Sequence, residues 1–133
     1  AAEGKKRGDA LRAVSVAYCN YVTQNPEMYQ MIMKIPHTNS EELIKTGRIV
    51  KSVLFQILSQ YTTDNAKIIF YSRYYHSILH GFVSLNRAGF FHDTFSTDAS
   101  LWNIIDNFIE QLEKGEISVY EKQQLQNRNQ AER

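Results

Sequence analysis

The stretch of residues 75–91 constrains the fold of this chain more than any other part of the sequence. Its apolar residues recur every three or four positions, which predicts a helix. Gly81 lies inside this helix, where glycine costs roughly 1 kcal/mol relative to alanine. Small residues follow one stripe of the helix at positions 77, 81, 84 and 88. Because small side chains let another backbone approach closely, this stripe predicts contact with a second helix.

The composition is that of an ordinary globular domain. The chain has 133 residues, of which 43% are hydrophobic and 22% charged, so it is long enough for one domain with its own core. Its formal net charge of +1 does not resemble the basic footprint of a nucleic-acid-binding domain. Cys19 is the single cysteine, and no apolar run reaches the length of a membrane span. We therefore expect a cytoplasmic protein without membrane contact.

The placement of apolar residues and helix-capping residues predicts an all-α bundle of about five helices. Only two prolines and six glycines interrupt the chain. We expect helices over residues 9–24, 26–35, 40–61, 65–88 and 98–115, with Asp9, Asp64 and Thr97-Asp98 at three of the N-termini. Gly89 and Gly115 suit the ends of the last two helices. Residues 116–133 are polar, and we expect a disordered tail or, as the alternative, a solvated helical extension.

The two last predicted helices carry more apolar surface than one core needs. On the helix over 98–115, we expect Leu101, Ile104 and Phe108 to face the chain's own core, which leaves further apolar residues for a partner. A second copy of the chain is the economical partner, through a two-fold symmetric four-helix bundle. The alternative is that this helix is fully covered within one chain. The expected dimer interface comprises Tyr74, Ser77, Gly81, Ser84, Ala88, Trp102, Ile105, Ile109 and Leu112.

Two segments together form a recognisable pattern. The first is residues 9–13 with Tyr18 and residues 25–29, and the second is His80-Gly81 followed by Gly89. This pattern resembles the C-terminal domain of tetracycline-repressor (TetR) family transcriptional regulators, in particular the subgroup named for a Trp-His-Gly signature. The resemblance extends from Asp9 to about Leu112. His76 stands where the signature has Trp, so the chain departs from the pattern there.

The resemblance implies an effector-binding and dimerisation domain of a bacterial-type repressor. In the family, a three-helix DNA-binding module precedes this domain, so we expect residues 1–8 to be a linker from such a module, residues 9–115 to be the regulatory domain and residues 116–133 to be the tail or extension. DNA binding would then belong to the absent N-terminal module. Effector binding would alter it by changing the spacing of the two modules across the dimer. The alternative is a helical homodimeric adaptor without a small-molecule ligand.

Aromatic and methionine side chains are candidates for the walls of an effector pocket. Tyrosine offers an apolar ring with a hydroxyl, and methionine adapts its shape, which suits a mostly apolar pocket with few polar anchors. For any single residue an ordinary core position is about as plausible, and the resemblance favours a pocket for a small hydrophobic or aromatic effector. The candidate ligand-binding residues are Tyr18, Tyr21, Met28, Met31, Phe55, Leu58, Tyr71, Tyr75 and Phe82.

Catalytic, metal and cofactor sites find little support in the sequence. His76 and His80 have the spacing of two metal ligands on one helix, but no third ligand completes a motif, so packing or hydrogen-bonding histidines are the favoured interpretation. Cys19 lies on a predicted helix as a small hydrophobe. No nucleophile motif, phosphate loop or dinucleotide fingerprint occurs. We therefore expect no enzymatic activity, no metal and no cofactor.

Overall fold

The regular elements of the structure are all helices. The computed structural model describes residues 2–27, 30, 41–120 and 122–133, and no strand occurs among them. The helices are α1 (Ala2–Gln24), α3 (Glu41–Leu58), α4 (Asn65–Arg87), α5 (Thr97–Lys114) and α6 (Lys122–Ala131). The predicted all-α class is confirmed. The helix expected over residues 26–35 lies mostly outside the described residues.

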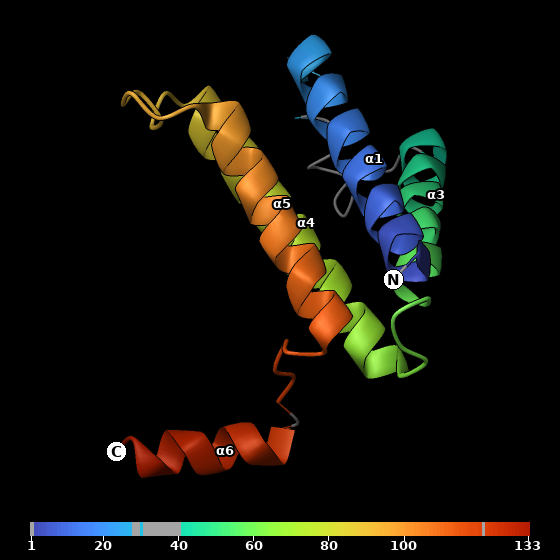
Figure 1. The fold of residues 1–133 in the computed structure, drawn as a ribbon, viewed down its shortest axis with the longest axis vertical. Helices are drawn as coiled ribbons and strands as arrows, with labels where there is room; N and C mark the ends of the chain where they lie inside the picture. Colours follow the sequence, from blue (N-terminus) through green and yellow to red (C-terminus); the bar gives the residue numbers. More distant parts are fainter. Residues whose placement is uncertain (1, 28–29, 31–40, 121) are drawn as a thin grey trace.

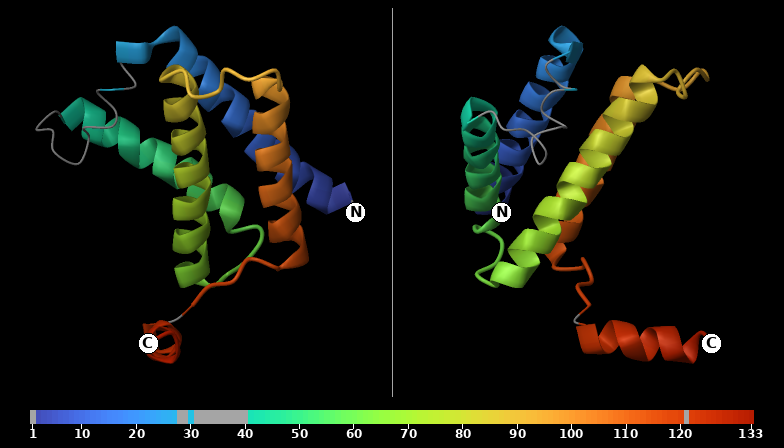
Figure 2. Two further views of the ribbon diagram at one scale, coloured as in Figure 1. Left: turned by 90° about the vertical axis from the view of Figure 1, so that its left-hand side faces the viewer. Right: turned by 180° about the vertical axis from the view of Figure 1, so that it is seen from behind.

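The helices form two layers. α4 and α5 run side by side in opposite directions, and α1 and α3 cross one face of this pair (Figures 1 and 2). We call this the inner face and the opposite one the outer face. No other helix among the described residues covers the outer face, which is turned toward the viewer in the left view of Figure 2. α6 leaves the lower end of α5 and projects on the side of the outer face.

Local capping signals set the ends of α4 and α5. The Asp64 side chain accepts a hydrogen bond from the backbone N–H of Ala66 at 3.0 Å, and Ser96 accepts one from Ala99 at 3.2 Å. Ser96 therefore caps α5 one residue before the predicted Thr97-Asp98. Gly89 and Gly115 have φ of +82° and +65°, a conformation that favours glycine and terminates the helices where the sequence predicts.

α1 begins earlier than the sequence analysis predicts. The helix starts at Ala2 rather than at Asp9, so the predicted start is wrong, and the role of residues 1–8 as a link to a preceding module stays a prediction. Arg7 and Gly8 pack on α5: Arg7 Nη2 lies 2.9 Å from Glu113 Oε2, and a Cβ added to Gly8 would lie 3.1 Å from Ile109 Cγ2. The first turns are thus held by contacts with a residue more than a hundred positions away.

The core is centred on Phe108 of α5. Its ring stacks on Tyr74 at a centroid distance of 5.2 Å and lies 5.7 Å from the ring of Tyr75, which joins α5 to α4. α1 and α3 contribute Leu11 and Leu58, both fully buried. The other buried members are Leu54, Ile57, Ile68, Tyr71, Leu79, Ile105, Ile109 and Leu112.

The orientation of α5 differs from the prediction of which apolar residues face the chain's own core and which face a partner. Ile105, Ile109 and Leu112, expected to face a partner, are only 1%, 4% and 6% exposed and lie in the chain's own core. Ile104, expected to face the core, is 36% exposed. The reason is that α1 packs on α5 through close contacts such as that of Gly8 with Ile109, which turns this side of α5 inward.

Residues 122–131 form helix α6. This agrees with the alternative prediction of a helical extension rather than with the expected disordered tail. The described side chains of α6 are exposed, including Leu125 at 46%. Arg128 pairs with Glu132 at 3.0 Å and lies over the ring of Tyr120 at 5.7 Å, contacts that stabilise the helix locally. Within the described part of the chain, no helix combines the length and the apolar character needed to cross a bilayer.

The burial of α5 leads to a stability prediction. Phe108→Ala should lower the free energy of unfolding by about 3–5 kcal/mol, because it leaves a cavity between α4 and α5. Trp102→Ala removes a larger side chain that is 38% exposed, and it should cost no more than about 2 kcal/mol. Urea unfolding followed by circular dichroism measures both. A larger loss for Trp102→Ala than for Phe108→Ala would contradict the observed orientation of α5.

Candidate functional site

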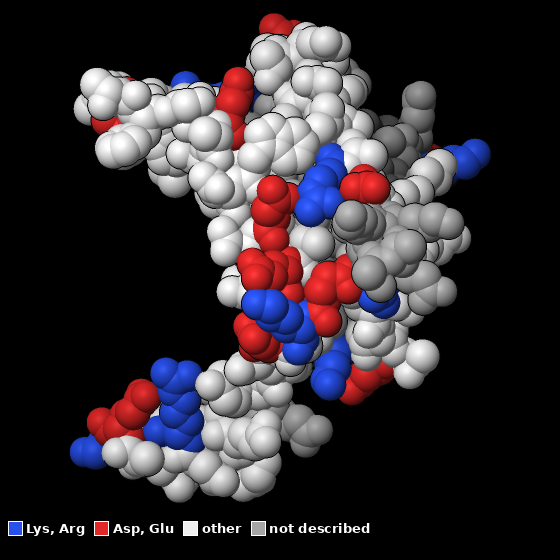
Figure 3. Space-filling view, viewed as in Figure 1, with Lys and Arg blue, Asp and Glu red and all other residues white. Residues whose placement is uncertain are grey.

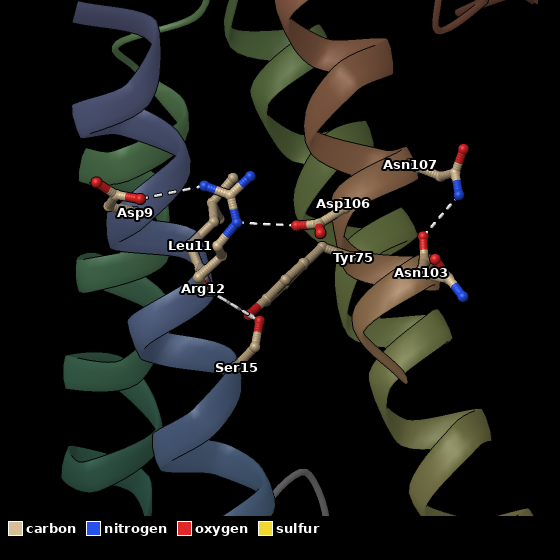
Figure 4. Close-up of polar contacts among 8 residues, drawn as sticks. All are labelled: Asp9, Leu11, Arg12, Ser15, Tyr75, Asn103, Asp106 and Asn107. Carbon is tan, nitrogen blue, oxygen red and sulfur yellow. Dashed lines mark hydrogen bonds and ion pairs between the residues drawn. The ribbon is translucent and has the colours of Figure 1, made fainter. Parts of the chain in front are cut away.

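Two buried hydroxyl groups join α1 to the inner face of α4. Ser15 Oγ lies 2.6 Å from Tyr75 Oη, and Ser15 donates to the backbone oxygen of Leu11 at 2.7 Å (Figure 4). Tyr75 Oη lies 3.4 Å from the same oxygen. Either hydroxyl can donate to the other, because both lie within hydrogen-bond distance of the Leu11 backbone oxygen. Ser15 and Tyr75 are only 1% and 3% exposed, so their polar atoms depend on each other.

This hydroxyl pair is electrically neutral. Burial raises the pKa of Tyr75 to about 12, and the hydrogen bond with Ser15 opposes this shift. The phenol therefore keeps its proton at ordinary pH. A neutral donor and acceptor pair in an apolar setting is the kind of polar anchor that a small-molecule pocket uses.

A second apolar cluster lies further along α1. Val22 of α1 packs with Val83 of α4, and Tyr18 and Cys19 lie partly buried against them. Burial raises the pKa of the Cys19 thiol, so it remains protonated and is a poor nucleophile. The two halves of α1 thus meet α4 differently, since the main core lies under the first half and this smaller cluster under the second.

The predicted ligand-binding residues fall into three groups. Tyr18 is half-buried and contacts both clusters, while Leu58, Tyr71, Tyr75 and Phe82 are buried. Tyr21 and Phe55 are 37% and 40% exposed, so they lie outside the core formed by the described residues. Met28 and Met31 lie outside the described residues. The structure therefore brings Tyr18 of α1 against the core that contains Tyr71 and Tyr75 of α4, and the role of the predicted residues toward a ligand stays a prediction.

Charged residues gather along the contact between α1 and α5, as the front of the molecule in Figure 3 shows. Arg12 Nε lies 2.8 Å from Asp106 Oδ1, and Arg12 Nη1 lies 3.1 Å from Asp9 Oδ1 (Figure 4). Arg7 pairs with Glu113, as described above, and donates to the backbone oxygen of Gln60 at 2.8 Å. Because Arg12 and its two carboxylate partners are more than a third exposed, each of the Arg12 pairs contributes about 0–1 kcal/mol, whereas the Arg7–Glu113 pair is more buried. These ion pairs favour one orientation of α1 on α5 but contribute little to the stability of the contact.

The outer face of the α4–α5 pair carries a groove of about 270 Å³. None of its lining residues is charged. Tyr74 was predicted for this face from the sequence. The amides of α5 were not, although they recur at every fourth position. The lining residues are Tyr74, Ile78, Asn103, Ile104, Asn107, Phe108 and Gln111.

The small-residue stripe of α4 lies open. Ser77 and Ala88 are exposed, and Gly81 and Ser84 are partly buried. A Cβ added to Gly81 would meet nothing within 4 Å, so no part of the described chain explains the glycine. Three of the predicted interface residues are covered by the chain itself: Ile105, Ile109 and Leu112. The others keep some exposed surface: the small-residue stripe, Tyr74 and Trp102, which is 38% exposed.

The two histidines of α4 lie near each other. The ring centroids of His76 and His80 are 6.3 Å apart with the rings at a steep angle. In the described part of the chain, no group of three or more His, Cys, Asp or Glu side chains is placed to hold a metal ion. The two histidines therefore form a pair on the surface of α4, and no third ligand among the described residues would complete a metal site with them.

Comparison with known proteins matches this all-helical arrangement to one family. Residues 11–108 match the family described as "Tetracyclin repressor-like, C-terminal domain". An uncharacterized HTH-type transcriptional regulator of Mycobacterium tuberculosis (strain ATCC 25618 / H37Rv) is 27% identical over 103 residues, which are 77% of this chain and 47% of the relative. The chain thus spans about half the length of that relative. Because the family match covers most of the sequence, the chain belongs to the tetracycline-repressor-like C-terminal domain family of transcriptional regulators.

Proposed function

We propose that this chain is the regulatory domain of a TetR-like regulator. It binds a small hydrophobic or aromatic effector between α1 and α4 and dimerises through the outer face of α4 and α5. The effector then alters DNA binding by a helix-turn-helix module that precedes α1 in the full-length protein. The observation that carries this proposal is the two-sided packing of α4, whose inner face meets α1 while its outer face stays uncovered.

The contact between α1 and α4 supports an effector site. Tyr18 of α1 packs there against a core that contains Tyr71 and Tyr75 of α4, and the Ser15–Tyr75 hydroxyl pair offers oxygen atoms that can accept a further hydrogen bond. Toward the C-terminal end of α1, after Tyr18, the buried residues in contact between the two helices are only Val22 and Val83 among the described residues. An apolar or aromatic ligand with one polar atom fits these surroundings, because the ring walls supply contact area and the hydroxyls supply orientation.

The attachment of α1 supports a switch. An effector shifts an equilibrium between two arrangements only by its difference in affinity for them, which is typically worth 1–3 kcal/mol. The ion pair of Arg12 with Asp106 is exposed and contributes less than that. A ligand that displaces α1 from α4 can therefore overcome the pairs that hold α1 on α5. A displacement of α1 would also move the helix-turn-helix module that we propose precedes it.

The outer face supports dimerisation. It presents the uncharged groove between α4 and α5 next to the small-residue stripe, and the space at Gly81 is not filled by the chain itself. An isologous contact places the same patch of two copies face to face, and a patch without charges meets its copy without repulsion. The helices of two copies would then form a four-helix bundle.

The dimer proposal predicts the effect of a charge in the groove. Ile104→Glu should convert the dimer to monomer, since it places two carboxylates in one apolar contact. Ile69→Glu is the matched control: Ile69 is 40% exposed, close to the 36% of Ile104, but it does not line the groove. Light scattering after size exclusion measures the mass. A dimeric Ile104→Glu variant, or a monomeric wild type, would contradict the assigned interface.

The effector proposal predicts a selective loss on removing one hydroxyl. Among small apolar and aromatic compounds, some should raise the melting temperature of the wild type by binding the folded state. Tyr75→Phe should cost about 1–3 kcal/mol of stability and reduce the shift produced by those compounds. Tyr120→Phe, in a tyrosine that is 56% exposed and belongs to neither buried cluster, should leave the shift unchanged. If no compound shifts the wild type, the ligand-free adaptor becomes the better description.

A further inference from the structure

The outer groove combines an apolar floor with a row of amides. Tyr74 and Phe108, stacked on each other, and Ile104 provide apolar surface. Along α5, amide side chains recur every four residues, so they lie on one stripe of the helix. This amide row consists of Asn103, Asn107 and Gln111.

The central amide retains hydrogen-bonding capacity. Asn107 Nδ2 donates to the backbone oxygen of Asn103 at 2.7 Å, as Figure 4 shows. A primary amide has two N–H groups and one carbonyl oxygen, so this bond leaves one N–H and Oδ1 of Asn107 for another partner. An amide is its own complement, since it can donate to and accept from an identical group. A carboxylate or an ammonium group in its place would repel its own copy.

Symmetry determines which residues would meet. In a two-fold contact, the residue at the centre of the contacting stretch lies beside its own copy. Asn107 is the middle of the α5 stretch 103–111 that lines the groove. Apolar side chains and small residues alone tolerate several registers, whereas a polar residue in an apolar contact selects the register that satisfies it, as a buried Asn does in coiled coils.

We propose that the amide row of Asn103, Asn107 and Gln111 pairs with the same row of a second copy and thereby fixes the register of the dimer. This inference rests on the proposed dimerisation through the outer face. A second copy is the occupant that fits, because the lining is uncharged and self-complementary. A partner carrying a charge at this place would leave it without a counter-charge in a mainly apolar contact, which disfavours unlike chains.

The test introduces opposite charges at the centre of the row. Asn107→Asp and Asn107→Lys should each weaken the homodimer by at least about tenfold, because like charges face each other. Mixed in equal amounts, the two variants should form a heterodimer at least about tenfold tighter than either homodimer, detected by native mass spectrometry. Asn20→Asp and Asn20→Lys, at an exposed position on α1, are the matched controls and should dimerise as the wild type does.

The outcomes separate this inference from the proposed interface. If Ile104→Glu dissociates the dimer while both Asn107 variants dimerise as tightly as the wild type, the amide row is overturned and the interface stands. The same holds if the mixed variants show no preference for the heterodimer. If Ile104→Glu leaves the dimer intact, both the interface and the amide row are overturned. Circular dichroism and melting confirm that each variant is folded, which the exposed position of Asn107 favours.

Discussion

The packing of Phe108 against Tyr74 and Tyr75 holds the architecture together. This contact fixes α5 beside α4, and Tyr75 continues from it to Ser15 on α1. Tyr74, on the other side of Phe108, lines the outer groove. One aromatic contact therefore connects the inner surface, where an effector is proposed, with the outer surface, where a second copy is proposed. A change in the position of Tyr75 would reach the dimer contact through two side chains.

The two surfaces differ in their chemistry, and this difference suits different tasks. The inner contact joins α1 to α4 through aliphatic and aromatic side chains and one neutral hydroxyl pair, which suits a ligand with matching shape and one polar group. The groove on the outer face has an uncharged lining, which suits a copy of the same chain. α1 meets α5 through the close approach of Gly8 to Ile109 and through ion pairs at the edge of the core, of which the Arg12–Asp106 pair is the more exposed.

The sequence predicts those features that depend on neighbouring residues. The start of α4 at Asp64 and its end at Gly89 follow from a capping carboxylate and a glycine with positive φ, so both were predicted correctly. The start of α1 differs from the prediction because Asp9 resembles an N-cap and the glycines at positions 4 and 8 disfavour a helix before it. Only the distant contact of Arg7 with Glu113 shows that these first turns pack on α5.

The orientation of α5 and the details of the site could not be predicted for a related reason. Apolar residues cover so much of α5 that several rotations bury a comparable area, and the packing of α1 on Ile109 selects one of them. The hydroxyl pair joins Ser15 and Tyr75, 60 positions apart, so no local pattern reveals it. The four-residue spacing of the amide row can be read from the sequence, but amides on a helix surface are commonly solvated. Only the structure shows that these three line a groove.

The most direct test of the central claim, that α4 has one face for α1 and another for a second copy, is hydrogen–deuterium exchange at two protein concentrations. One concentration lies well below the dissociation constant of the dimer and the other well above it. Two-sided packing of α4 predicts slower exchange at high concentration in residues 74–88 and 103–111, with no change in residues 2–24 of α1. Slower exchange confined to α1 or α3 in the dimeric sample would contradict it.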